Sequence, residues 1–154
     1  MGLLSYRAAG HDDVPLLVAM YADPEVSRYW DGRAYDAEEM HARLDRADVD
    51  AWIVEEDGEP VGYLQSWWED DEPRRGGLDG FLIPTARGRG IMPTVARRLA
   101  ECLLDEGWLS VTVDPYAWNE RALRGWAKAG FVEESRHPSD DEHTAEWVLM
   151  RFVR

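Results

Sequence analysis

The sequence predicts a single α/β (α+β) domain of 154 residues, built around one mixed β-sheet. Three observations point to this fold class. β-rich runs alternate along the chain with runs whose apolar residues recur at helical spacing. Two of the β-rich runs are joined at Asp57-Gly58 as a hairpin. A glycine-rich turn in residues 85–95 (TARGRGIMPTV) leaves a strand and opens a helix, and the expected order of elements is βααβββαβαββ.

The first part of the chain predicts one strand and two helices. Residues 3–10 (LLSYRAAG) alternate weakly and form the first strand. Residues 11–23 begin with acidic capping residues and Pro15 before an apolar stripe, which is typical of a helix. Residues 27–35 (SRYWDGRAY) predict a loop that carries a tryptophan, and residues 36–48 predict a second, more polar helix.

The middle of the chain predicts a hairpin, a loop, a strand and a long helix. Residues 51–69 form the hairpin, and the acidic residues 69–77 (EDDEPRRGG) predict a loop. Residues 78–84 (LDGFLIP) predict a strand that ends at a proline. The helix after the glycine-rich turn has one apolar face, with four-residue spacing of Ile91, Val95, Leu99 and Leu103.

The last part of the chain predicts three strands and one helix. Residues 108–115 (WLSVTVDP) form a short buried strand, and residues 119–130 form a helix that Gly130 closes as a C-cap. Residues 131–138 and 144–153 form the final strands around the acidic loop SDDEH. The last strands could pair across a two-fold axis, so both a monomer and a homodimer stay open.

The charge balance is strongly acidic, with 31 acidic against 17 basic side chains and a formal net charge of -14. Such a field repels nucleic acid and anionic membranes and favours cationic partners. Solubility alone is the simpler explanation of the same charge. No apolar run approaches membrane-spanning length, and no signal peptide opens the chain, so a cytoplasmic location is expected.

Cysteine and histidine predict neither a disulfide nor a metal site. The single cysteine, Cys102, falls on the apolar side of a predicted helix, which predicts a buried, inert thiol. The four histidines have no metal-ligand spacing and are interpreted as surface residues: His11, His41, His137 and His143.

The glycine-rich turn fits one of three phosphate-binding patterns. A Walker loop needs a lysine that is absent, and a dinucleotide fingerprint needs a glycine where Pro93 stands. The third pattern, Arg/Gln-x-x-Gly-x-Gly/Ala, binds the pyrophosphate of coenzyme A, and its first four positions are Arg87, Gly88, Arg89 and Gly90. Its backbone N–H groups and the helix N-terminus attract phosphate. An ordinary strand-to-helix turn is the alternative.

Two residues depart from that pattern without removing its function. Met92 stands where a small residue is expected, but its side chain is flexible and its N–H remains available. Pro93 falls in the first helical turn, where a missing N–H costs little. We expect a working but reshaped phosphate cradle.

With these motifs the chain resembles the GNAT superfamily of acetyl-CoA-dependent N-acetyltransferases. From about Trp52 to Phe131 it is most similar to the aminoglycoside 6'-N-acetyltransferases and their relatives in siderophore biosynthesis. The motifs that carry the resemblance are WIVEEDGEPVGYLQSW, GLDGFL, RGRG and VDPYAWNERALRGWAKAGF. The resemblance implies a GNAT-like fold, with a central mixed, mostly antiparallel, splayed β-sheet flanked by about four helices.

The resemblance also implies where acetyl-CoA binds. The pantetheine arm would lie between strands 78–84 and 108–114 and take backbone hydrogen bonds from them. The implied cofactor-binding residues are Phe81, Leu82, Ile83, Arg87, Gly88, Arg89, Gly90, Met92 and Asn119.

For the reaction, the resemblance implies Asp79 as general base and Asp114 as a second carboxylate in the acceptor site. Two carboxylates at adjacent strand ends attract an ammonium, and their repulsion raises one pKa. Asp114, before Pro115, also reads as a turn former. The implied substrate-binding residues are Trp30, Gln65, Trp67, Asp79 and Asp114, with Trp68 as a second flat surface and the acidic residues 69–72 nearby as ammonium partners.

One departure from the family motif affects the leaving group. The family's tyrosine two positions before Lys-Ala-Gly-Phe, proposed to protonate the departing thiolate, is replaced by Trp126, whose indole is no useful acid. A thiol has a pKa near ~8.5, so releasing it as thiolate at neutral pH costs only about 2 kcal/mol. Tyr116 or water can supply the proton, so activity is expected and the tyrosine's role does not transfer.

The leading prediction is therefore acetyl transfer from acetyl-CoA to the 6'-amino group of an aminoglycoside, a cationic amine suited to the acidic chain. Two alternatives stay open. One is a GNAT enzyme for another amine, such as a siderophore hydroxamate precursor, a polyamine or a protein N-terminus. The other is a non-catalytic acyl-CoA-binding module, which would bind coenzyme A without turnover.

Overall fold

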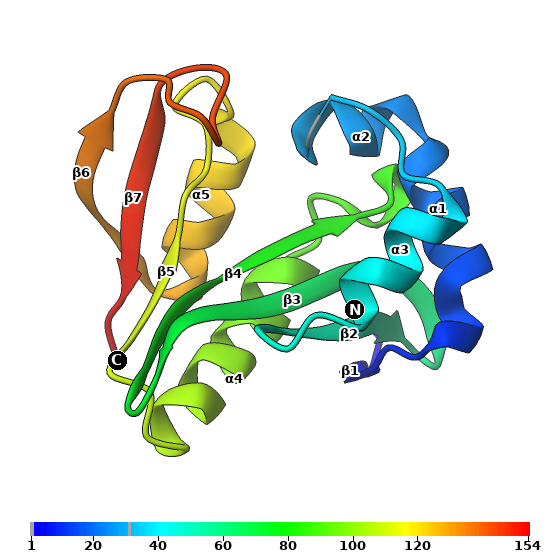
Figure 1. Ribbon diagram of the computed structural model, residues 1–154, viewed down its shortest axis with the longest axis horizontal. Helices are drawn as coiled ribbons and strands as arrows, with labels where there is room; N and C mark the ends of the chain where they lie inside the picture. Colours follow the sequence, from blue (N-terminus) through cyan, green and yellow to red (C-terminus); the bar gives the residue numbers. More distant parts are fainter. Residues whose placement is uncertain (1, 31) are drawn as a thin grey trace. The chain divides into compact units, whose positions relative to one another are not determined.

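The computed structural model describes residues 2–30 and 32–154, without the side chains of Asp70 and Asp71, two of the expected ammonium partners. Figure 1 shows its helices and strands along the chain. Their bounds are β1 (Leu4–Ala8), η1 (His11–Asp13), α1 (Val14–Ala22), α2 (Pro24–Trp30), α3 (Ala37–Leu44), β2 (Val49–Glu56), β3 (Glu59–Asp71), β4 (Arg74–Leu82), η2 (Pro84–Ala86), α4 (Ile91–Asp105), β5 (Ser110–Val113), α5 (Glu120–Ala129), β6 (Phe131–His137) and β7 (Trp147–Phe152).

The strands form one seven-stranded sheet in the order β1-β2-β3-β4-β5-β7-β6. β4 and β5 pair in parallel, from Arg75 opposite Ser110 to Gly77 opposite Thr112. The pairs β1/β2, β2/β3, β5/β7 and β6/β7 are antiparallel. The mixed, mostly antiparallel sheet is thus confirmed, with five α-helices rather than about four, whereas its splay stays a prediction.

By its internal contacts the chain divides into two compact units. The first comprises Met1–Trp67 and Asp79–Ile91, and the second comprises Trp68–Leu78 and Met92–Arg154. The strands β3 and β4 and the helix α4 each contribute residues to both units. That the two units form one domain stays a prediction.

In the first unit, helices α1, α2 and α3 pack on one face of β2, β3 and β4. Ile53 of β2 lies opposite Tyr63 of β3, and both are wholly buried. Around them lies an apolar cluster to which the three helices, the segment before α3 and β4 contribute Val14, Leu17, Met20, Tyr21, Val26, Tyr35, Met40 and Phe81. This cluster gives the strands a rigid base on the side that bears Gln65 and Asp79.

The expected hairpin turn at Asp57-Gly58 is confirmed. Both residues have positive φ, 52° for Asp57 and 82° for Gly58, as a two-residue turn between antiparallel strands requires. The start of α3 is equally local in origin. Asp36 accepts a hydrogen bond from the Glu39 amide at 2.8 Å, and the Glu39 carboxylate accepts one from the Asp36 amide at 3.2 Å.

In the second unit, α5 packs on β6, and the junction between them follows the sequence closely. Asn119 caps α5 by accepting a hydrogen bond from the Ala122 amide at 3.2 Å. Gly130 closes the helix with φ 111°, as expected. Phe131 then enters the core between Trp126 and Phe152, with ring centroids 5.4 and 5.3 Å away.

The loop expected at residues 27–35 is partly wrong, because its first residues belong to helix α2 (Pro24–Trp30). Asp23 starts this helix by accepting a hydrogen bond from the Glu25 amide at 2.9 Å. Val26 is wholly buried in the apolar cluster of the first unit. Tertiary burial therefore stabilises seven residues whose own pattern is too short to predict a helix.

The loop expected at residues 69–77 is also wrong, because β3 continues to Asp71 and β4 begins at Arg74. Trp68 is only 8% exposed and packs edge-on against Trp108 at 5.9 Å. The Arg74 guanidinium covers the ring of Trp68 at 4.0 Å. These contacts stabilise the end of β3 and the start of β4. Trp68 is a core residue rather than an exposed surface for sugar rings.

Cys102 is exposed, not buried as expected. Its Sγ lies 3.7 Å from Oε1 of Glu106. Partial burial and the nearby carboxylates of Glu106 and Asp105 raise the pKa of the thiol. Both effects disfavour the reactive thiolate, and the inertness of the thiol stays a prediction.

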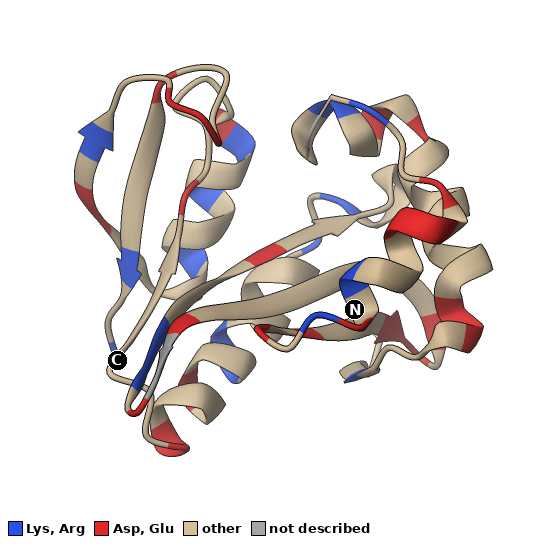
Figure 2. Cartoon of the chain, in the orientation of Figure 1, with Lys and Arg blue, Asp and Glu red and all other residues tan. Residues whose placement is uncertain are grey.

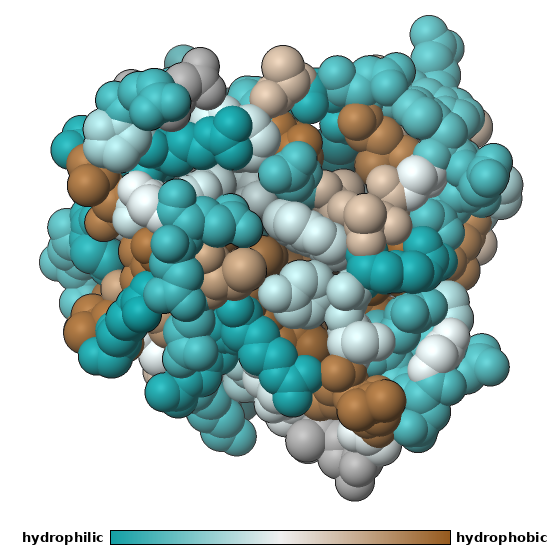
Figure 3. All heavy atoms as spheres, turned by 90° about the horizontal axis from the view of Figure 1, so that it is seen from below, coloured by the Kyte–Doolittle hydropathy of each residue, from teal (hydrophilic) through white to brown (hydrophobic). Residues whose placement is uncertain are grey.

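Charged and polar side chains cover much of the face that Figure 3 shows. Acidic residues are spread over the helices and strands of both units (Figure 2). The face in Figure 3 is largely hydrophilic and is interrupted by small hydrophobic areas. Among the described helices, none has both the length and the apolar character to cross a membrane.

Candidate functional site

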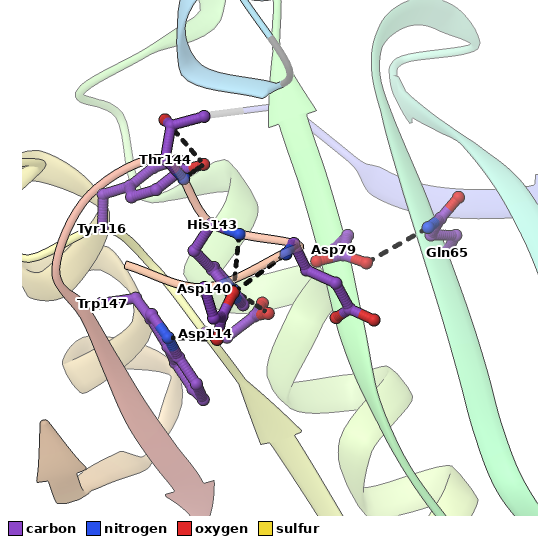
Figure 4. A network of polar contacts seen from close by, with 9 residues as sticks. Gln65, Asp79, Asp114, Tyr116, Asp140, His143, Thr144 and Trp147 are labelled. Atoms are coloured by element: carbon purple, nitrogen blue, oxygen red, sulfur yellow. Dashed lines mark hydrogen bonds and ion pairs between the residues drawn. The ribbon is translucent and has the colours of Figure 1, made fainter. Parts of the chain in front are cut away.

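The carboxylate of Asp79 on β4 is held by Gln65 of the neighbouring part of β3. Nε2 of Gln65 donates a hydrogen bond to Oδ2 of Asp79 at 3.2 Å (Figure 4). Gln65 is only 6% exposed, and its Oε1 accepts hydrogen bonds from the Tyr63 hydroxyl at 2.7 Å and from Arg43 at 3.2 Å. Because two donors face Oε1, the amide nitrogen must face Asp79. Asp79 thus has a fixed donor and remains half-exposed.

Arg43 of α3 is a site residue that the sequence did not reveal. Its guanidinium lies over the rings of Trp30 at 5.5 Å and Tyr35 at 4.9 Å. It also donates to the Tyr35 hydroxyl at 3.2 Å and to Gln65. Arg43 therefore brings two predicted substrate-binding residues, Trp30 and Gln65, into one contact network.

The hydroxyl of Tyr63 supports this network as a donor. Burial raises the pKa of Tyr63 well above its ordinary value, so the phenol keeps its proton at physiological pH. The third predicted aromatic residue, Trp67, is half-buried opposite Val49 on the β2–β3 ladder. No described contact joins Trp67 to Gln65 or Asp79.

The glycine-rich loop adopts a backbone that requires glycine. Gly88 and Gly90 have φ of 78° and 77°, and α4 begins at the next residue, Ile91. A Cβ added to either glycine would meet no atom within 4 Å. Glycine is therefore needed for the left-handed conformation rather than for room. Left-handed glycines directly before a helix N-terminus are typical of loops that bind phosphate.

The two arginines of this loop differ in what they contact. Arg87 donates to the Leu82 carbonyl at 3.3 Å and to the Glu25 carbonyl, and it lies over the Tyr29 ring at 5.4 Å. Arg89, 44% exposed, forms an ion pair with Glu56 at 2.9 Å. An exposed ion pair is weak and can give way to phosphate, whereas Arg87 anchors the loop to α2.

The other predicted cofactor residues have defined structural settings. Phe81 and Leu82 are buried on β4, and the Ile83 amide donates to the Val61 carbonyl at 2.9 Å. Met92 is the second residue of α4 and is half-buried, and Asn119 uses its Oδ1 as the α5 cap. Their contacts with a cofactor stay predictions.

In the second unit, Asp114 directly follows β5 and is bound to His143. Oδ2 of Asp114 lies 2.8 Å from Nε2 of His143, and the carboxylate is 32% exposed (Figure 4). His143 was expected on the surface, but it is only 8% exposed, so that expectation is wrong. Its place comes from stacking on Trp147, with centroids 4.3 Å apart and planes 12° from parallel.

The second ring nitrogen of His143 faces another carboxylate. Nδ1 lies 2.9 Å from Oδ1 of Asp140. The backbone amides of Glu142 and His143 and the indole of Trp147 also donate to Asp140, at 2.9, 2.8 and 3.0 Å. A carboxylate oxygen at each ring nitrogen favours the imidazolium form of His143, which donates from both nitrogens. Burial lowers the pKa of His143, but the hydrogen bonds and charges of Asp140 and Asp114 outweigh it and raise the pKa above its ordinary value.

Two further aromatic residues of the second unit are Tyr116 and Trp126. The Tyr116 hydroxyl accepts a hydrogen bond from the Thr144 amide at 3.3 Å, and its ring lies edge-on to His143 at 5.9 Å. Trp126 is 8% exposed and packs on Phe131. Within the described residues, no group of three or more His, Cys, Asp or Glu side chains is arranged to hold a metal ion.

Comparison with known proteins identifies relatives of the whole chain. The family model described as an acetyltransferase (GNAT) domain matches residues 4–132. This chain is also similar to the aminoglycoside N(6')-acetyltransferases type 1 of Klebsiella pneumoniae and Serratia marcescens. Each is 26% identical to this chain over 167 residues, which cover 96% of this chain and 83% of the relative.

Solved structures share the fold over nearly the full length. The structure of AAC(6')-Ib in complex with paromomycin and acetyl-CoA has a TM-score of 0.85 at 25% identity, covering 98% of this chain and 93% of that chain. The spermidine N-acetyltransferase of Vibrio cholerae with CoA and spermine has a TM-score of 0.83 at 16% identity, covering 97% and 94%. The second likeness concerns the fold alone.

Proposed function

Because the chain belongs to the acetyltransferase (GNAT) domain family and is thus an N-acetyltransferase, we propose that it acetylates the 6'-amino group of an aminoglycoside. The acyl donor of the family is acetyl-CoA. The observation that carries the proposal is the half-exposed carboxylate of Asp79. Asp79 lies on β4, the strand that leads into the glycine loop, and Gln65 of β3 donates a hydrogen bond to it. The substrate class is supported by the two curated relatives and by the net charge of -14.

The residues of the loop fit coenzyme A. The left-handed Gly88 and Gly90 leave open space where side chains would stand, and the N-terminus of α4 follows directly. Acetyl-CoA supplies an activated acetyl thioester when bound. The loop N–H groups would bind its phosphates, Arg89 would exchange Glu56 for a phosphate oxygen, and the backbone of Phe81–Ile83 would orient the pantetheine arm.

Asp79 would then act on the acceptor amine. As an anion it attracts the ammonium, and as a base it removes the proton that blocks the nitrogen lone pair. Gln65 keeps the carboxylate oriented through its Nε2, while Arg43 and Tyr63 keep the amide from turning over. Trp30 would offer an aromatic surface to the sugar, and Asp114 a second carboxylate for an ammonium.

The proposal is tested by following free coenzyme A thiol with acetyl-CoA and kanamycin, using spermine and a peptide with a free N-terminus as alternative acceptors. We expect turnover that saturates in kanamycin and exceeds the rate with either alternative. Faster turnover with spermine or the peptide would overturn the aminoglycoside assignment. Acetyl-CoA binding without turnover on any amine would indicate a non-catalytic module. A cytoplasmic location belongs to the same proposal, which leaves open a monomer or a homodimer.

The Gly88→Ala variant tests the phosphate cradle. Placing alanine at φ 78° costs about 1–2 kcal/mol, and we expect the strain to distort the cradle and raise the KM for acetyl-CoA by about 5- to 30-fold with little change in kcat. Gly107→Ala is the matched control, since Gly107 also has positive φ and open space but lies after α4. An acetyl-CoA KM that rises equally in both variants would contradict the loop's role.

A further inference from the structure

Two carboxylates and an aromatic ring hold the side chain of His143, which has no role in the mechanism above. Asp114 and Asp140 each lie within 3 Å of one ring nitrogen, and Trp147 covers one face. Tyr116 lies edge-on to His143 from the segment after β5, and His137 of β6 stacks on Trp147 at 4.4 Å. Asp141 and Glu142 directly precede His143 in the chain and are exposed. The position is built for a cation.

The two carboxylates are not equivalent. Asp140 accepts hydrogen bonds from His143, from two backbone amides and from the Trp147 indole. The bond from the His143 ring, followed by those from the amides of Glu142 and His143, lowers the pKa of Asp140. Asp114 has one described donor, Nε2 of His143, and is 32% exposed. When His143 loses its proton, the Nδ1–H bond to the better-held Asp140 persists. The bare Nε2 then faces Asp114, and that carboxylate lacks its cation.

Asp114 can therefore pair with His143 or with a cation from solution. An acceptor ammonium beside Asp114 repels the imidazolium and favours its neutral form, just as an imidazolium already there disfavours an incoming ammonium. Two ligands that oppose each other in this way, here a proton and an ammonium, must do so reciprocally.

We infer that His143 is a positioning residue of the acceptor site. Its imidazolium forms an ion pair with Asp114 until the ammonium of the substrate replaces it. The inference rests on the proposed function, since it takes Asp114 as a carboxylate of the acceptor site. Binding the amine releases the Nε2 proton of His143 to solvent, and the ammonium keeps its own protons at this step. The affinity for the amine rises with pH until His143 is neutral.

The test measures proton release by calorimetry of kanamycin binding in buffers of different ionisation enthalpy. Below the pKa of His143, we expect the wild-type protein with coenzyme A to release up to about one proton, with Kd falling by up to about tenfold per pH unit. In His143→Gln, whose amide still donates but cannot titrate, release and pH dependence should disappear. His137→Gln, which alters the other histidine on Trp147, should behave as wild type.

Titration of His143 by ¹⁵N NMR provides a readout that needs no turnover and no folded His143 variant. Asp114→Asn and saturating kanamycin should each lower the pKa of His143, and Asp140→Asn should lower it too. A pKa that Asp114→Asn leaves unchanged, or proton release that persists in His143→Gln, overturns the inference. If kanamycin does not bind, the aminoglycoside assignment fails separately, and spermine then serves as the probe. Binding of neither amine overturns the inference as well.

Discussion

Asp79→Asn is expected to lower kcat for acetyl transfer by about 10²- to 10⁴-fold, the usual contribution of a general base. The substitution keeps the size of the side chain, and the new amide oxygen can still accept the hydrogen bond from Nε2 of Gln65. What is lost is the negative charge and the ability to take a proton. The decisive measurement is kcat from single-turnover and steady-state release of coenzyme A thiol.

Asp50→Asn is the matched control, because Asp50 is an exposed carboxylate on β2, a strand that β3 separates from β4. It removes the same charge from the first unit and should leave kcat within about twofold, as expected for surface substitutions away from the site. Equal losses in both variants would indicate a general effect of net charge. Full activity of Asp79→Asn would remove Asp79 from the chemistry.

Gly62→Ala is expected to destabilise the protein by about 1–3 kcal/mol, as overpacking in a core does. The new Cβ would lie 2.4 Å from the backbone oxygen of Phe81 and 2.8 Å from Cδ2 of Leu82. A backbone oxygen cannot swing away as a flexible side chain can, so β3 and β4 must move apart. Urea unfolding should give a lower midpoint with an unchanged slope.

Gly125→Ala is the control, with an expected change in stability of the opposite sign. Gly125 lies within α5, and an added Cβ meets nothing within 4 Å. Alanine there should stabilise the protein by about 0.5–1 kcal/mol through its higher helix propensity. A neutral Gly62→Ala would show that the two strands have more freedom than their close approach indicates.

Short-range chemistry made much of the fold predictable. The Asp57-Gly58 turn, the Asp36 cap and the Gly130 cap each depend on residues within a few positions, and all are present. Helix α2 was not predictable, because the burial of Val26 depends on distant side chains. The strand extension to Asp71 likewise depends on Trp108, which lies 40 residues after Trp68.

The candidate site was also predictable only where it depends on residues close together in the sequence. The glycine loop is visible in sequence, since its backbone demands glycine at two positions. The partners of Gln65 and Asp114 are not. Arg43, which bonds to Gln65, lies 22 residues before it, and His143, which bonds to Asp114, lies 29 residues after it. A histidine three residues after Asp140 and four before Trp147 was a local signal, but it did not disclose the second carboxylate.

Arg87 gives the glycine loop a mechanical link to the part of the chain that carries Trp30. Its guanidinium is bonded to the Glu25 carbonyl and covers Tyr29, one residue before Trp30 on α2. A force on the loop is therefore transmitted along a single short helix to an aromatic ring of the predicted acceptor site.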